Sequence, residues 1–151
     1  MSDISIDAIK SLRDRTGLSV ADVKKALTEA GGDEAKAVEL LKARGGDIAT
    51  KKAGRELNAG LVDSYVHSNR KVGCMVEVLC ETDFVARNEE FQQFAHDVAM
   101  HIAAMKPATV EELLEQPSIK DPNVTIGGLL TGLIAKIGEN MQIGRFELFE
   151  I

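Results

Sequence analysis

Residues 72–80, with the sequence VGCMVEVLC, constrain the fold more than any other segment of this chain. Successive side chains of a β-strand lie on opposite faces of the sheet. Here both sets are apolar, and Glu77 is the only charge. A strand that is apolar on both faces is covered on both faces. The segment therefore predicts a strand with helices against one face and a second layer of protein against the other.

The hydrophobic period changes near Gly60. Residues 61–67 alternate as a strand does, residues 68–71 form a hairpin loop, and residues 141–151 form the last strand. Helical spacing returns between the strands, in a long helix from Asn88 to Pro107, a short one after Thr109 and another after Thr125. The second part of the chain is therefore predicted to be α+β, with three antiparallel strands and helices on one face.

Residues 4–45 have helical spacing only and predict three short helices that end at Gly17, Gly31 and Gly45. We predict a three-helix domain at residues 1–45, a linker at 46–58 and an α+β core domain at 59–151. The linker is polar and basic, and we interpret its Lys51, Lys52 and Arg55 as a solvated face.

The charge and the cysteines limit the class of protein. The formal net charge is −6, whereas domains that bind nucleic-acid backbones are usually basic, so we expect no direct nucleic-acid partner. Cys74 and Cys80 lie on one predicted strand about 20 Å apart, too far to pair, and are interpreted as buried thiols. No signal core or membrane-spanning segment is seen, so we expect a cytoplasmic protein without a membrane partner.

Nothing in the sequence indicates catalysis. No nucleophile is paired with a base, and no cysteine or histidine spacing fits a metal, so we expect no catalytic residue, cofactor or metal. His101 falls on the same helical row as Phe94 and Val98. We interpret it as a partly buried core histidine, with a partner contact as the alternative. The chain is predicted to bind rather than to transform a substrate.

Thr82–Val85 is informative because it places an aspartate and a large aromatic between a predicted strand and a predicted helix. A side chain at such a corner can project. Phe84 could therefore enter a cleft in another protein, with Asp83 competing for a polar or cationic site there. Alternatively, Phe84 packs under the corner and Asp83 caps the turn. Local chemistry favours the second interpretation.

Three segments together identify a family. These segments are residues 12–17 with 22–27, residues 77–91 around Thr82–Val85, and residues 99–104 with the ending at 145–147. The chain resembles bacterial elongation factor Ts, the guanine nucleotide exchange factor for elongation factor Tu. Residues 12–27 are similar to the ubiquitin-associated-like helical domain of that family. The chain resembles the short form, which lacks a second core repeat and a coiled-coil insertion.

The resemblance assigns roles to individual residues. It implies that Asp83 and Phe84, flanked by Thr82 and Val85, intrude into the GTPase domain of elongation factor Tu and disturb its magnesium site. Further contacts with the partner are implied for residues elsewhere in the chain: Arg13, Val20, Ala21 and His101. Longer relatives often have methionines where this chain has Val20 and Ala21, so that patch should bind somewhat differently.

The resemblance also implies the activity and the assembly. The protein should promote GDP release from elongation factor Tu during translation elongation, without bond-making chemistry. The uncovered face of the sheet predicts a homodimer that forms sheet on sheet. The alternative function is a non-catalytic protein-binding module with a ubiquitin-associated-like domain, an account in which Thr82–Val85 has no role.

Overall fold

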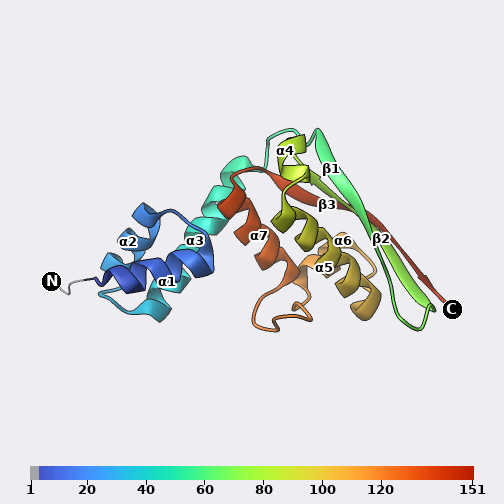
Figure 1. Cartoon of the computed structure of the whole chain (residues 1–151), viewed down its shortest axis with the longest axis horizontal. Helices are drawn as coiled ribbons and strands as arrows, with labels where there is room; N and C mark the ends of the chain where they lie inside the picture. Colours follow the sequence, from blue (N-terminus) through green and yellow to red (C-terminus); the bar gives the residue numbers. More distant parts are fainter. Residues whose placement is uncertain (1–3) are drawn as a thin grey trace. The chain divides into compact units, whose positions relative to one another are not determined.

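The computed structural model describes residues 4–151 as two compact units (Figure 1). Unit 1 contains residues 4–52 together with Thr131–Gly138, and unit 2 contains Ala53–Leu130 and Glu139–Ile151. Residues 1–3 of the predicted domain 1–45 lie outside the described part. The predicted domain boundaries at 45 and 59 stay a prediction.

Unit 1 contains the three predicted helices, α1 (Ile6–Thr16), α2 (Val20–Glu29) and α3 (Glu34–Lys52). Serine hydroxyls cap the first two, since Ser5 Oγ accepts from Ala8 N and Ser19 Oγ accepts from Asp22 N, both at 3.1 Å. Gly17 ends α1 in the left-handed conformation, with φ at 68°. The starts of α1 and α2 and the end of α1 are thus set by local chemistry that the sequence displays.

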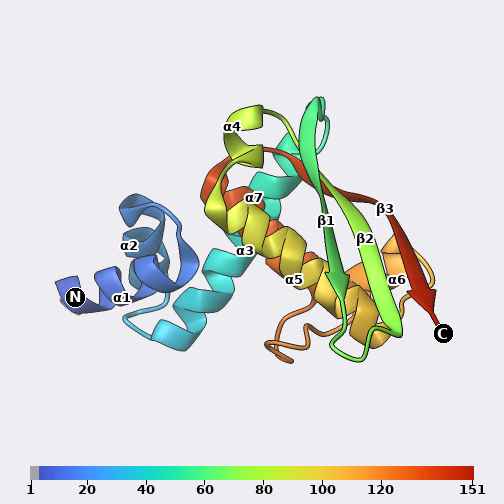
Figure 2. The same ribbon diagram turned by 45° about the vertical axis from the view of Figure 1, so that its right-hand side comes forward.

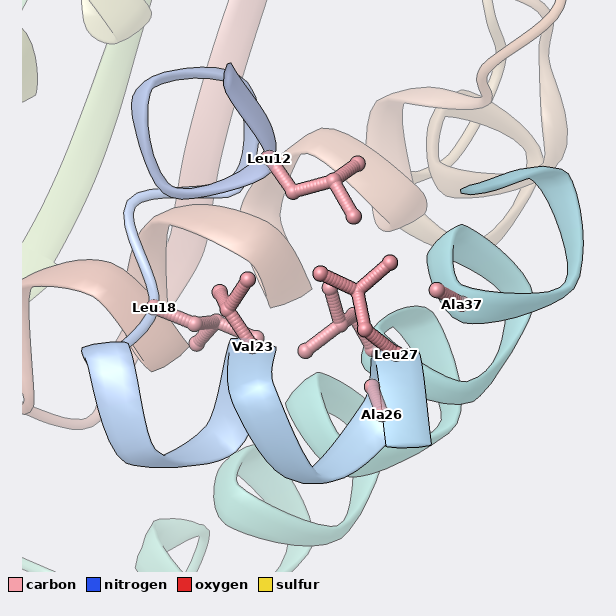
Figure 3. Close-up of a cluster of buried hydrophobic side chains, with 7 residues drawn as sticks. Leu12, Leu18, Val23, Ala26, Leu27 and Ala37 are labelled. Atoms are coloured by element: carbon pink, nitrogen blue, oxygen red, sulfur yellow. The ribbon is translucent and has the colours of Figure 1, made fainter. Parts of the chain in front are cut away.

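The core of unit 1 lies where the three helices meet. Figure 3 shows its apolar side chains pointing toward one another from α1, α2, α3 and the α1–α2 loop. The cluster comprises Leu12, Leu18, Val23, Ala26, Leu27, Ala37 and Leu41. Ile48 of α3 and Ala135 pack against it. The unit therefore uses residues beyond position 45 for its own core.

The predicted end of the third helix at Gly45 and Gly46 is wrong, because α3 continues to Lys52. Two glycines cost a helix about 1 kcal/mol each relative to alanine. Gly45 is buried, and a Cβ there would lie 3.6 Å from Ala135 Cβ. Packing of a neighbouring segment at this position, together with Ile48, favours the continued helix over the break that propensity predicts. Residues 46–52 of the predicted linker are thus part of α3.

Unit 2 is built on the predicted antiparallel sheet, with strand order β1–β2–β3 (Figures 1 and 2). The strands are β1 (Ala59–Val66), β2 (Val72–Cys80) and β3 (Met141–Glu150). Tyr65 pairs with Cys74 and Cys74 with Leu148, which fixes the register. The inner face of β2 consists of Val72, Cys74, Val76, Val78 and Cys80, and all of these except the half-buried Val72 are buried. Both cysteines are free thiols in buried positions, as predicted.

Helices cover the inner face. The elements that follow β2 are α4 (Asp83–Ala86), α5 (Glu89–Met105), α6 (Val110–Glu115) and α7 (Ile126–Ile137). In both views α5 runs along β1 and β2 (Figures 1 and 2), and α6 contacts β3. Asn88 caps α5 and Thr109 caps α6, as the sequence predicts. The α+β class with helices on one face is therefore confirmed.

The outer face of the sheet keeps large apolar side chains exposed. The exposed fractions are 61% for Val62, 65% for Val66, 55% for Met75 and 72% for Phe149. The one charge of β2 on this face, Glu77, pairs with Arg145 Nε at 2.6 Å. The hydrogen bonds from Arg145 hold the pKa of the Glu77 carboxyl below its usual value. Within residues 4–151 no segment buries these four apolar side chains.

Candidate functional site at the end of strand β2

Thr82–Val85 is not an irregular corner. The structure forms a one-turn helix there, α4, at the end of the sheet opposite the β1–β2 hairpin (Figures 1 and 2). The sequence predicts a corner here, between a strand and a helix, at which neither element sets the direction of the side chains; the structure adds a separate one-turn helix at that corner. The cause is local, because Thr82 is an N-cap residue that starts a helix immediately. The direction of the following side chains is therefore set by α4.

The side chain of Phe84 projects from α4 into solvent. It is 91% exposed, the highest value among the five phenylalanines of the chain. Asp83 beside it is also exposed, whereas Val85 is only 8% exposed and packs into the unit. The alternative in which Phe84 packs under the corner is therefore wrong. An aromatic ring and a carboxylate stand side by side on the free face of the turn.

Glu139, just before β3, binds the start of α4. Its Oε1 accepts hydrogen bonds from the backbone N–H groups of Glu81 and Thr82, both at 3.1 Å. Its Oε2 accepts from the Thr82 hydroxyl at 2.6 Å. The same hydroxyl oxygen accepts from Val85 N at 3.4 Å. One carboxylate therefore engages three donors from the two residues that lead into α4.

Glu81 makes the reciprocal contact. Its Oε1 accepts from Asn140 N at 2.7 Å and lies 3.5 Å from Arg55 Nη1. The Asn140 side chain is buried and donates to the carbonyl of Arg55 at 2.9 Å. Two neighbouring carboxylates thus each accept the backbone N–H of the other segment. This arrangement joins β2, the start of β3 and the residues before β1.

Cys80 closes the base of the corner. Its thiol is buried and donates to the carbonyl of Thr82 at 3.2 Å. Burial, and then the nearby carboxylate of Glu139, raise the pKa of this thiol above its usual value. Cys80 is therefore held as a neutral donor that contributes to the turn.

The other predicted contact residues lie elsewhere. Arg13 is exposed on α1, and Val20 and Ala21 are exposed at the start of α2. All three belong to unit 1, whereas Thr82–Val85 belongs to unit 2. The structure therefore places them on the surface, as a partner contact requires, but on the other compact unit.

His101 lies inside unit 2. Its side chain is 1% exposed, and its Nε2 lies 2.9 Å from Gln116 Oε1 on the segment after α6. Its Nδ1 is buried without a hydrogen-bond partner. The interpretation as a core histidine is confirmed, with more complete burial than predicted. A direct partner contact by His101 does not fit this burial.

Sequence reasoning missed Glu81, Glu139 and Asn140. Glu139 lies 57 residues from Thr82 in the sequence, so no local pattern connects the two. The connection arises from the register of the antiparallel pair, which brings Cys80 opposite Met141 and so places the segment after β2 beside the segment before β3. No helix of residues 4–151 is long and apolar enough to cross a bilayer.

Comparison with known proteins identifies the family of this chain. Residues 81–151 match the family model described as "Elongation factor TS". The chain is 44% identical to elongation factor Ts of Solidesulfovibrio magneticus, over 97% of this chain and 96% of the relative. It is 40% identical to elongation factor Ts of Carboxydothermus hydrogenoformans, over 98% of this chain and 89% of the relative.

The relatives differ in length. The alignment with the Solidesulfovibrio protein extends over 191 residues, although this chain has 151, so the relative contains segments that this chain lacks. Elongation factor Ts of Clostridium novyi is 50% identical over 98% of this chain, which spans only 48% of that relative.

The similarity covers the helices of unit 1 as well as the corner at α4. This chain belongs to the elongation factor Ts family, whose members are nucleotide exchange factors for elongation factor Tu and not enzymes.

Proposed function

We propose that the corner at α4 is the part of this exchange factor that opens the nucleotide site of elongation factor Tu. The observation that carries the proposal is Phe84, an aromatic side chain that is 91% exposed on a turn bound by the carboxylate of Glu139. Exposed aromatics of this kind become central anchors when a partner buries them. Phe84 enters the GTPase domain, and Asp83 beside it disturbs the magnesium site.

The mechanism is thermodynamic linkage. A factor that binds nucleotide-free elongation factor Tu more tightly than the nucleotide-bound form must weaken nucleotide binding by the same ratio. No proton transfer or covalent step is needed. A translation factor of this family acts in the cytoplasm, where GTP can then displace it from the partner.

Unit 1 supplies a second contact in this proposal. Arg13 offers a cation, and Val20, which is 49% exposed, offers apolar surface next to Ala21. His101 acts from inside unit 2, by supporting the packing of α5 through Gln116, 2.9 Å away.

The test is release of fluorescent GDP from elongation factor Tu by stopped flow, with catalytic amounts of the factor and excess unlabelled nucleotide. We expect Phe84→Ala to slow the catalysed release about 10- to 100-fold at limiting factor, because burying a phenylalanine contributes about 1.5–3 kcal/mol. Asp83→Ala should also slow release. Met105→Ala, which removes an apolar side chain that is 47% exposed at the other end of α5, is the matched control.

Two results would refute the proposal. A wild-type protein that binds elongation factor Tu but leaves the rate of GDP release unchanged would be a plain binding module. Equal rates for Phe84→Ala and Met105→Ala would remove Phe84 from the mechanism while leaving exchange itself intact.

We further propose that the protein is a homodimer that pairs the outer faces of two sheets. Val62, Val66, Met75 and Phe149 supply apolar surface there, and monomeric proteins rarely expose large contiguous patches. A hollow of about 400 Å³ on the hairpin end of this face is lined by several of these side chains and by Ile151. A two-fold axis would bury one self-complementary surface. Light scattering at several micromolar concentrations tests the proposal, and a constant monomer mass would refute it.

A further inference from the structure

We propose that Glu139 is a positioning residue for nucleotide exchange. In this inference, which rests on the proposed function of the corner, its carboxylate holds α4 in the one orientation that presents Phe84 and Asp83 to elongation factor Tu. Glu139 itself need not touch the partner. Its side chain is only partly exposed, and both of its oxygens are occupied by the corner.

The need for a brace follows from the length of α4. The helix contains four residues, and an isolated helix this short is unstable in water because nucleation is costly. Its orientation must therefore come from outside. One support is Val85, which is buried on the inner side of the turn. Two others lie at the entrance: the Cys80 thiol, which donates to the Thr82 carbonyl, and the hydrogen-bond set of Glu139.

Glu139 supports the entrance at two levels. The N–H groups of Glu81 and Thr82 come after the end of β2 and before the first turn of α4, so they have no partner in either element. An ionised carboxylate makes stronger hydrogen bonds to such donors than a neutral acceptor does. Glu139 therefore fixes the backbone at the point where the chain turns into α4.

The Thr82 hydroxyl carries the constraint into the helix. It donates to Glu139 Oε2 at 2.6 Å, so its proton is committed to the carboxylate. Its oxygen then faces Val85 N, 3.4 Å away, as an N-cap does. Asp83 and Phe84 are the first two residues after Thr82, so the cap determines the orientation of both exposed side chains. Without Glu139 the hydroxyl can rotate away and the cap weakens.

The expected defect is a smaller population of the competent corner. If α4 samples several orientations, the apparent affinity for elongation factor Tu equals the intrinsic affinity multiplied by the fraction of molecules that present Phe84 correctly. For Glu139→Ala we expect the factor concentration at half-maximal GDP release to rise about 10-fold, with a maximal rate within about 2-fold of wild type. Glu139→Gln keeps an acceptor for the two N–H groups and can donate to Thr82 Oγ, so it should recover most of the loss.

A double-mutant cycle separates positioning from general destabilisation. GDP release from elongation factor Tu is measured for Glu139→Ala, Phe84→Ala and the double variant. If Glu139 acts through the corner, the double variant should be no more than about 3-fold slower than Phe84→Ala alone, because coupled residues are not additive. Defects that multiply would overturn the inference. Glu112→Ala, which removes the acceptor of Ala108 N at the start of α6, is the control for loss of a carboxylate cap.

Each failure has a distinct signature. Normal exchange by Phe84→Ala contradicts the proposed function of the corner. A slow Phe84→Ala protein with a normal Glu139→Ala protein contradicts the positioning role alone. If Glu139→Ala does not fold, Thr82→Val carries the same test, since it removes the hydroxyl link to Glu139 together with the cap that this hydroxyl provides for Val85 N. A Thr82→Val protein with unchanged half-maximal concentration would then overturn the inference.

Discussion

Two phenylalanines seven positions apart make opposite predictions for stability. Phe84 on α4 is 91% exposed, and Phe91 on α5 is 0% exposed. Truncating Phe91 to alanine leaves a cavity and should cost about 3–5 kcal/mol. Truncating Phe84 removes at most a tenth of a buried phenylalanine's contribution, or about 0.3 kcal/mol or less. Alanine also favours the helical turn of α4 more than phenylalanine does.

The melting temperatures should separate clearly. For a protein of this size 1 kcal/mol corresponds to about 2–4 °C, so Phe91→Ala should melt about 6–20 °C below wild type and Phe84→Ala within about 1 °C of it. Differential scanning calorimetry on both variants gives these values. In GDP release at a temperature where both are folded, the order should reverse, with Phe84→Ala slower than Phe91→Ala.

The reasoning fails if Phe84→Ala melts early and exchanges nucleotide normally. That pair of results would mean that the ring is part of the core in solution. An early melt together with slow exchange would instead show that the Phe84 ring contributes both to stability and to exchange. Met105→Ala, exposed by 47%, measures the effect of removing any half-exposed apolar side chain.

Three further predictions follow from other parts of the fold. Met75→Glu should convert the proposed dimer to a monomer in light scattering without unfolding it, because Met75 is 55% exposed within the chain; a dimer of unchanged mass would move the interface elsewhere. Burial raises the pKa of the Cys74 thiol to about 11. At pH 8 only about one such thiol in a thousand is therefore ionised, and alkylation should be slow until denaturant is added. The same shift predicts that the stability of the protein falls as pH rises between about 9 and 11, which an alkaline unfolding series measures. Gly60→Ala should destabilise the protein by about 1–3 kcal/mol in urea unfolding, because φ is 155° and the new Cβ would lie 2.5 Å from the carbonyl oxygen of Val78; a wild-type midpoint would contradict it.

Most of the fold could be predicted because each element carries its own signal. Alternation located the strands, and hydroxyl or amide caps at Ser19, Asn88 and Thr109 located helix starts that the structure confirms. The third helix was predicted to end too early, because a glycine pair is a strong local signal for a break. Here Gly45 packs against Ala135, and that contact between segments far apart in the sequence outweighs local propensity.

The candidate site could be predicted only in part. The sequence placed Asp83 and Phe84 at the end of a strand, but their exposure depends on α4, whose start is one capping threonine. Local chemistry favoured a buried Phe84, and the resemblance favoured an exposed one; the structure agrees with the resemblance. Glu139 could not be found, because its importance arises only when β3 pairs with β2.

The reciprocal contacts of Glu81 and Glu139 also affect the order in which the protein folds during its synthesis. Ribosomes deliver the chain from its N-terminus, so Phe84 leaves the exit tunnel well before Glu139, which lies 57 residues after Thr82. Until β3 pairs with β2, the turn that displays Phe84 lacks its hydrogen bonds to Glu139. A nascent chain therefore exposes the hydrophobic Phe84 side chain before the orientation of that side chain is fixed. If α4 has the proposed role, we expect competence for nucleotide exchange to be acquired at the end of folding, when the last strand joins the sheet.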